Sequence, residues 1–279
     1  GRVWEISGDT PVAGGCIHDA RRVRTSEGPI FVKCSPDEDR ALLETEARAL
    51  REIGETGTVR VPEVLAIGSH EGTTFLALEW IDLTSLDAGS GKLLGERLAD
   101  LHTVRSGATY GWEEDNFIGS TPQKNDPSED WPDFFATRRI EPQLRLARDQ
   151  GRRLPSAEPF LSQIESFFPE PAPAPAPLHG DLWGGNAAAT ESGEPVLFDP
   201  AFYRGDPEAD IAFTHFFGGF PQSFYDAYGE KIPPRPGWKT RQTLYNLYHV
   251  INHLNLFGSS YQGQARRMIS ELNDRAGGG

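Results

Sequence analysis

One stretch of the chain combines the residue types that phosphoryl transfer from ATP requires. Residues 179–186 run His-Gly-Asp-Leu-Trp-Gly-Gly-Asn, and Asp199 follows thirteen residues after Asn186, behind a short apolar segment. The transfer needs a carboxylate that accepts or orients the attacking hydroxyl, and an Asn and a second Asp that hold Mg²⁺ against the phosphates. Kinase catalytic loops place the metal-binding Asn five residues after the base Asp, which is the spacing of Asp181 and Asn186. The alternative is a turn-rich loop in which these side chains only cap backbone groups.

A lysine in the first part of the chain fits the same chemistry. Lys33 follows the apolar pair Phe31-Val32 and is one of only five lysines. In kinases a strand lysine pairs with the α- and β-phosphates, and a carboxylate on the following helix holds it. Glu46 is the expected partner and Glu44 the alternative, because side chains two positions apart on a helix cannot share a face. An ordinary surface lysine on a strand is the other interpretation of Lys33.

Two further segments lie where a nucleotide would bind. The segment Gly14-Gly15-Cys16 falls between the first two expected strands, and glycine lets backbone N–H groups approach phosphate oxygens. Glu79, Trp80 and Ile81 end an apolar strand at the junction of two lobes, where backbone groups could hydrogen-bond adenine. An ordinary hairpin turn and a plain strand end are the alternatives for these two segments.

These residues must be positioned by a small β-rich lobe and a larger helical lobe. Residues 1–80 contain short strand-like runs with glycine turns, and one helical pattern that ends near Gly54. Longer helical patterns follow up to Asp274, interrupted by an extended proline-rich connector at 169–177. The expected architecture is α+β: an antiparallel N-terminal lobe, 1–80, a mainly helical C-terminal lobe, 81–279, and a ligand cleft between them. Strands are expected at 3–6, 30–33, 59–67 and 74–81, and helices at 38–53, 92–102, 131–150 and 160–168.

The composition excludes several classes of protein. The chain has 279 residues, with 27 Lys and Arg against 41 Asp and Glu, so its formal net charge is −14. An acidic surface of this kind argues against nucleic acid or an anionic membrane as a partner. Two cysteines, Cys16 and Cys34, cannot form a disulfide framework, so a cytoplasmic location is expected. No apolar run approaches the roughly 18 residues of a membrane span.

Several motifs together resemble the fructosamine kinase (ketosamine-3-kinase) family, which has the aminoglycoside-phosphotransferase, protein-kinase-like fold. They are residues 130–135 (Asp-Trp-Pro-Asp-Phe-Phe), 179–186, 198–201 (Phe-Asp-Pro-Ala), 208–212 (Glu-Ala-Asp-Ile-Ala) and 217–221 (Phe-Gly-Gly-Phe-Pro). The resemblance covers nearly the whole chain. It implies ATP-dependent phosphorylation of the 3-hydroxyl of a ketosamine, such as a fructosamine or ribulosamine. The acceptor would be a small molecule or a glycated lysine of a protein.

The resemblance also implies roles for individual residues. By motif match, Asp181 is the general base, Asn186 and Asp199 are Mg²⁺ ligands, and Lys33 with Glu46 positions the phosphates. The segment from Glu79 to Ile81 becomes the adenine hinge. Together with the glycine loop it would bind the nucleotide, through Gly14, Gly15, Cys16, Glu79, Trp80 and Ile81.

Two ring-bearing residues are candidates for contact with the substrate. Trp183 lies two residues after the base, where an aromatic face can pack on a sugar, and a core tryptophan is the alternative. His253 lies in the last helical region and could reach the substrate pocket, and a hydrogen-bonded helix histidine is the alternative.

Cys16 raises a separate hypothesis. This chain departs from the family that it resembles after the glycines, where the common bacterial pattern is Asp-Ile-Asn and this chain has Cys16-Ile17-His18. The side chain of the usual Asn, and any hydrogen bond that it makes, is absent here. An exposed thiol near phosphate-binding N–H groups is open to oxidation, and an intermolecular disulfide would then inhibit the enzyme. The alternative is an inert small residue.

Other activities remain open from the sequence. Another kinase of the same fold could act on an aminoglycoside, choline or a sugar hydroxyl. A protein kinase is disfavoured, because Pro200-Ala201 rather than Phe-Gly follows Asp199 and no Ala-Pro-Glu segment follows. A non-catalytic nucleotide-binding module would lack the base or a metal ligand, and none is missing. A monomer or a homodimer is expected.

Overall fold

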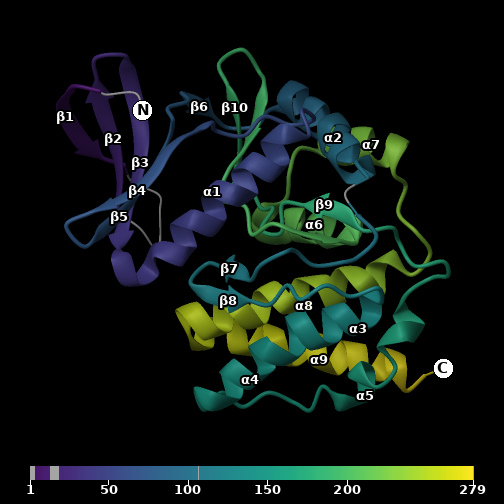
Figure 1. Ribbon diagram of the computed structural model, residues 1–279. Helices are drawn as coiled ribbons and strands as arrows, with labels where there is room; N and C mark the ends of the chain where they lie inside the picture. The colour runs from purple at the N-terminus through teal and green to yellow at the C-terminus, as the bar shows by residue number, and fades with distance from the viewer. Residues whose placement is uncertain (1–3, 13–18, 106, 279) are drawn as a thin grey trace.

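The computed structural model describes residues 4–12, 19–105 and 107–278, and in it a five-stranded antiparallel sheet stands apart from a larger helical region (Figure 1). The strand order in the sheet is β1-β2-β3-β5-β4. The strands are β1 (Ile6–Pro11), β2 (Asp19–Thr25), β3 (Gly28–Pro36), β4 (Val64–His70) and β5 (Thr73–Glu79). Lys33 lies opposite Leu76 in the pairing of β3 with β5, in the middle of this sheet.

Helix α1 (Arg40–Glu55) packs on the sheet and carries the glutamates considered above. Its apolar residues Leu43, Ala47 and Leu50 recur with helical spacing, and they pack against Leu76 and Leu78 of β5. The helix continues past the predicted stop at Gly54 to Glu55 and is followed by Gly57, which has a φ of 64°. Glycine adopts this left-handed conformation without steric cost, so Gly57 is the effective stop.

The predicted strands have different bounds in the structure. The strand expected at 59–67 begins at Val64, because Pro62 has no N–H for the sheet ladder. The strand expected at 74–81 ends at Glu79. The first strand spans Ile6–Pro11 rather than 3–6.

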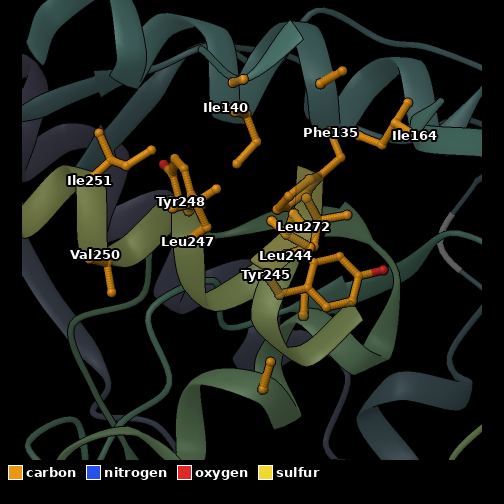
Figure 2. Close-up of a cluster of buried hydrophobic side chains, with 14 of the residues drawn as sticks. Phe135, Ile140, Ile164, Leu244, Tyr245, Leu247, Tyr248, Val250, Ile251 and Leu272 are labelled. Carbon is orange, nitrogen blue, oxygen red and sulfur yellow. The ribbon is translucent and has the colours of Figure 1, made fainter. Parts of the chain in front are cut away.

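The helical region is built around α8 (Trp238–Phe257), which is buried along most of its length. Figure 2 shows Leu244, Tyr245 and Leu247 of this helix packing with Phe135 and Ile140 from another segment. The other helices are α2 (Ala88–Thr103), α3 (Trp131–Phe135), α4 (Glu141–Asp149), α5 (Glu158–Leu161), α6 (Pro207–Thr214), α7 (Gln222–Lys231) and α9 (Gln262–Ala276).

The single helix expected at 131–150 is divided. Helix α3 passes into a π-helical turn at Ala136–Ile140 before α4 begins at Glu141. Pro142 in the first turn of α4 has no N–H, and its ring would clash with the carbonyl four residues earlier. The wider turn accommodates both constraints.

Short strands in the helical region flank residues 179–186 and Asp199, which carry the predicted catalytic and metal-binding side chains. β6 (Leu83–Thr84) pairs with the hairpin β10 (Ala187–Thr190) and β11 (Pro195–Leu197), and β9 (Ala176–Leu178) pairs with β12 (Tyr203–Gly205). A separate hairpin is formed by β7 (Asn116–Ile118) and β8 (Thr121–Gln123).

The predicted fold class is therefore confirmed: an antiparallel sheet with one main helix precedes a larger, mainly helical region in a mixed α+β chain. The division of the chain at residue 80 stays a prediction. Among the helices that the structure describes, none is long and apolar enough to cross a membrane.

Candidate active site

The ends of three short strands bring the predicted catalytic residues together. Asp181 lies three residues after β9, Asn186 directly precedes β10, and Asp199 lies two residues after β11. The backbone N–H of Phe198 donates to the carbonyl of Asn186 at 3.1 Å, which joins the two ends of the hairpin. Asn186 and the segment that carries Asp199 are thus neighbours in space.

Asp181 and Asn186 are directly linked. The side-chain nitrogen of Asn186 donates to the Asp181 backbone oxygen at 2.8 Å and to Asp181 Oδ2 at 3.0 Å. Burial raises the pKa of Asp181 to about 7, since the hydrogen bond from Asn186 only partly offsets the loss of hydration, and the nearby carboxylate of Asp199 raises it further. A carboxyl group with a pKa near neutrality is suited to accept a proton in catalysis.

Asp210 of α6 anchors the loop that carries Asp181. Its two carboxylate oxygens accept the backbone N–H groups of His179, at 2.7 Å, and Gly180, at 2.8 Å. The ring of His102 in α2 lies 3.2 Å from Asp210 and 2.8 Å from the hydroxyl of Tyr228 in α7. Three helices therefore hold the loop through one buried carboxylate.

His179 braces the same loop. Its Nε2 donates to the carbonyl of Phe198 at 2.9 Å, and its Nδ1 accepts the backbone N–H of Asp181 at 3.2 Å. Burial lowers the pKa of His179, in keeping with a neutral ring that donates at one nitrogen and accepts at the other. Gly180 has a φ of 80°, and a Cβ there would lie 2.1 Å from the Ala201 oxygen, so only glycine fits.

Lys33 joins the sheet to the hairpin. Its Nζ lies 2.7 Å from Glu46 Oε1 and 2.5 Å from Asp199 Oδ1. Burial opposes the charge on the amino group, but the two carboxylates outweigh it and hold the pKa of Lys33 above its ordinary value. Glu44, the alternative partner, instead pairs with Arg40 at the surface, at 2.7 Å.

The donor set of Asn186 and Asp199 fits Mg²⁺. Asn186 uses its amide nitrogen on Asp181, which turns its oxygen Oδ1 away from that residue. Asp199 has a φ of 56°, a strained conformation that proteins retain mainly at functional sites. Within the described ranges, no three His, Cys, Asp or Glu side chains gather as a metal site. Mg²⁺ commonly takes one or two protein oxygens and completes its coordination with phosphates and water.

In the predicted adenine hinge, the side chains of Glu79 and Trp80 already contact other residues of the chain. The side chain of Glu79 pairs with Arg60 at 2.6 Å. The ring of Trp80 lies under the guanidinium group of Arg22, 4.6 Å away, and its Nε1 donates to Asp82. Any contact of Glu79, Trp80 and Ile81 with adenine is therefore expected from their backbone.

The glycine loop, with Gly14, Gly15 and Cys16, lies outside the described residues. The redox hypothesis for Cys16 therefore stays a prediction.

The two substrate candidates meet the same aromatic ring. The ring centroid of Phe217 lies 5.2 Å from that of Trp183 and 5.5 Å from that of His253. Phe217 is half exposed and has a φ of 50°, which is unusual for a bulky residue. The Nδ1 of His253 donates to the carbonyl of His249 at 2.7 Å. Trp183, Phe217 and His253 thus form one wall, which we name the aromatic wall.

Gly185 determines where the indole of Trp183 lies. A Cβ at Gly185 would stand 2.3 Å from the Trp183 ring, whereas a Cβ at Gly184 would meet nothing within 4 Å. The second glycine of the loop therefore leaves the space that the indole fills.

The sequence analysis missed His102, Asp210 and Phe217, and also His249, whose Nδ1 lies 4.0 Å from Oδ1 of Asp181. Asp210 and Phe217 lie inside motifs that had been noted without a role. His249 precedes His253 by four positions and shares its helix face, so the spacing could have indicated it. No sequence signal pointed to His102.

The fold and this site together define a kinase of the protein-kinase-like class. The crystal structure of aminoglycoside phosphotransferase APH(4)-Ia superposes with a TM-score of 0.63 over 99% of this chain and 97% of that chain, at 14% identity. The likeness at this identity concerns the fold. A crystal structure from Haemophilus somnus, described as a putative fructosamine-3-kinase, superposes with a TM-score of 0.90 over 96% of this chain and 92% of that chain, at 27% identity.

The chain belongs to the fructosamine kinase family, whose model matches residues 1–275. A Synechocystis protein described as a probable ketoamine kinase is 40% identical, over 97% of this chain and 92% of its own. The chloroplastic protein-ribulosamine 3-kinase of Arabidopsis thaliana is 38% identical, over 97% of this chain and 84% of its own. The expected family is thereby confirmed, and the protein is an ATP-dependent kinase.

Proposed function

We propose that the protein phosphorylates the 3-hydroxyl of a ketosamine, a fructosamine or ribulosamine, with ATP as the phosphoryl donor. The acceptor is either a small molecule or a glycated lysine of a protein. The names of the relatives support this substrate class, since they include a ketoamine kinase and a ribulosamine 3-kinase.

One observation carries the mechanism: the partly buried carboxylate of Asp181 is oriented by Asn186, beside the ion pair of Lys33 with Asp199. In our proposal the acceptor oxygen attacks the γ-phosphorus in line, the bond from that phosphorus to the β,γ-bridging oxygen breaks, and ADP leaves. The proton of the acceptor hydroxyl passes to Asp181. The raised pKa of Asp181 supports this role, because a base is most effective when its pKa lies near the working pH.

The positioning of the nucleotide rests on the other charged residues. Lys33, held by Glu46, would face the α- and β-phosphates, as the corresponding strand lysine does in kinases generally. Asn186 and Asp199 would hold Mg²⁺, and neutralisation of the phosphate oxygens is the chemistry that this ion supplies when bound. We assign the adenine contacts to the backbone of Glu79, Trp80 and Ile81.

The aromatic wall is the proposed binding surface for the sugar. Aromatic faces offer apolar area to the C–H groups of a sugar ring, and Trp183 lies two residues from the base. The formal charge of −14 favours a cationic amine such as a ketosamine over a polyanionic partner. We retain a cytoplasmic location and a monomer or homodimer as predictions.

A panel of acceptors tests the proposal. ADP release from MgATP is measured with fructosyl-lysine, ribulosyl-lysine, a glycated peptide, an aminoglycoside, choline and free fructose, and ³¹P and ¹³C NMR locate the phosphate on the product. We expect at least a hundredfold higher kcat/KM for the ketosamines and a phosphate on O3. A higher kcat/KM for the aminoglycoside, choline or free fructose would instead assign the protein to another kinase activity of this fold.

A further inference from the structure

His249 on α8 carries a buried nitrogen that no contact in the described part of the chain satisfies. The residue is 5% exposed, and its Nδ1 has no hydrogen-bond partner. The same nitrogen lies 4.0 Å from Oδ1 of Asp181, the proposed base. Buried polar groups nearly always have a partner, so a lone nitrogen at this place requires an explanation.

The ring of His249 is held in one orientation by packing. It stacks on the ring of Phe213 with a centroid distance of 3.6 Å and an interplanar angle of 7°. Burial, with the nearby charges of His253 and Arg139, holds the pKa of His249 well below its ordinary value. The ring is therefore neutral, with one nitrogen that donates and one that accepts. A phenylalanine would fill the same stack, so packing by itself does not account for the nitrogen.

The distance between His249 Nδ1 and Asp181 Oδ1 fits one bridging oxygen. At 4.0 Å the two atoms are too far apart for a direct hydrogen bond. An oxygen placed about 2.8 Å from each of them would make hydrogen bonds of ordinary length to both. Asp181 Oδ2 already accepts a hydrogen bond from Asn186, and Oδ1 is the oxygen that lies nearest to His249 Nδ1.

We propose that His249 positions the acceptor, through a hydrogen bond from Nδ1–H to the substrate hydroxyl that lies against Asp181. The hydroxyl has a single proton, which it directs to Asp181 Oδ1, so only its lone pairs face the histidine and Nδ1 must be the donor. This arrangement aligns the remaining lone pair for attack. The inference rests on the proposed function and adds a positioning residue that is specific to the acceptor rather than to ATP.

The test compares His249→Phe with His249→Asn. The phenylalanine variant keeps the stack on Phe213 and loses the donor, whereas the asparagine variant places an N–H close to the position of Nδ1. We expect His249→Phe to lower kcat/KM for the acceptor about tenfold or more, the effect of one lost hydrogen bond. KM for MgATP and the melting temperature should stay near the parent values, and His249→Asn should restore much of the loss.

The matched control is His215→Phe. His215 also stacks on an aromatic ring, that of Tyr225 at 4.2 Å, and its replacement should leave the acceptor kcat/KM unchanged. An unchanged acceptor kcat/KM in His249→Phe would overturn the inference, and so would an equal loss for MgATP with no rescue by asparagine.

Failure of the proposed function gives a different result. If the parent chain prefers an acceptor other than a ketosamine, that function is wrong, and the same variants still test His249 against the preferred hydroxyl. If the parent turns over no acceptor, both proposals are refuted together.

Discussion

The amino group of Lys33 lies 2.5 Å from Oδ1 of Asp199, although 166 residues separate them in the chain. The lysine belongs to the central strand of the N-terminal sheet, and the aspartate follows the hairpin of β10 and β11 in the helical region. Glu46 of α1 lies on the same amino group at 2.7 Å. One buried cation thus connects the sheet, its helix and the loop that we propose to hold Mg²⁺.

Because Lys33 pairs with Glu46, we expect substitution of Glu46 to affect stability and nucleotide binding much more than substitution of the nearby Glu44. Glu46→Gln removes one of the two charged partners of Lys33, so we expect the unfolding free energy to fall by about 1.5–3 kcal/mol and KM for MgATP to rise about tenfold. The control is Glu44→Gln, two residues away, which only loses an exposed pair with Arg40 and should stay within about 0.5 kcal/mol of the parent. Similar effects of both variants would contradict the assignment of Glu46.

Asp181→Asn tests the base. The variant keeps the shape of the side chain and one acceptor oxygen but cannot take up the proton of the hydroxyl. We expect unchanged MgATP binding in calorimetry and a fall in kcat of about 10²–10⁴-fold, the size of a lost general base. Turnover close to that of the parent would refute the proposed role of Asp181.

Gly185→Ala tests the aromatic wall. A methyl group there would collide with the Trp183 indole, so the ring must move, and we expect kcat/KM for the acceptor to fall by up to about a hundredfold. Gly184→Ala places the same methyl group in open space and should behave like the parent. Steady-state kinetics with varied acceptor and varied MgATP would separate the two sites. Equal kinetics of the two variants would argue against a substrate role for Trp183.

Asp210→Asn tests the anchor of the catalytic loop. An amide has only one acceptor oxygen, so one of the buried N–H groups of His179 and Gly180 loses its partner. We expect the unfolding free energy to fall by about 1–3 kcal/mol, with a lower kcat because the base is less well held. Asp226→Asn, an exposed change on α7, is the control in thermal denaturation. A parent-like melting temperature for Asp210→Asn would contradict the anchoring role.

Buried histidines predict a loss of stability in weak acid. Burial lowers the pKa of His179 and His249, so each takes up a proton on unfolding once the pH is below the unfolded value of about 6.5. Their contribution is complete above that pH and is lost as the pH falls toward the folded pKa, by up to about 1.4 kcal/mol per pH unit for each ring. Urea unfolding measured between pH 7.5 and 5.5 gives the unfolding free energy at each pH. We expect this free energy to change less steeply with pH in His249→Phe than in the parent. An identical pH dependence of the unfolding free energy in the two proteins would mean that His249 is not neutral in the folded chain.

The sequence predicted much of the catalytic loop because its information is local. Asp181 and Asn186 are five residues apart, and a loop of that length keeps their side chains within reach of each other, as the hydrogen bond between them shows. Helix α1 could also be predicted from the sequence, since the spacing of its apolar residues alone determines which face it buries. The predicted strand ends were less accurate, because the pairing partner of each strand decides where its ladder of hydrogen bonds stops. In β4, Pro62 also delays the start of the strand to Val64.

By itself, therefore, the sequence determined the α+β class, the family and the chemical types at the site. Only the tertiary structure decided that Lys33 contacts Glu46 rather than Glu44, because that depends on how α1 lies on the sheet. It also decided that Trp183 and His253 share the ring of Phe217, and that His249 faces Asp181 across 4.0 Å. These relationships join residues that lie more than ten positions apart. Their distances are set by the packing of whole elements against one another, which no local pattern records.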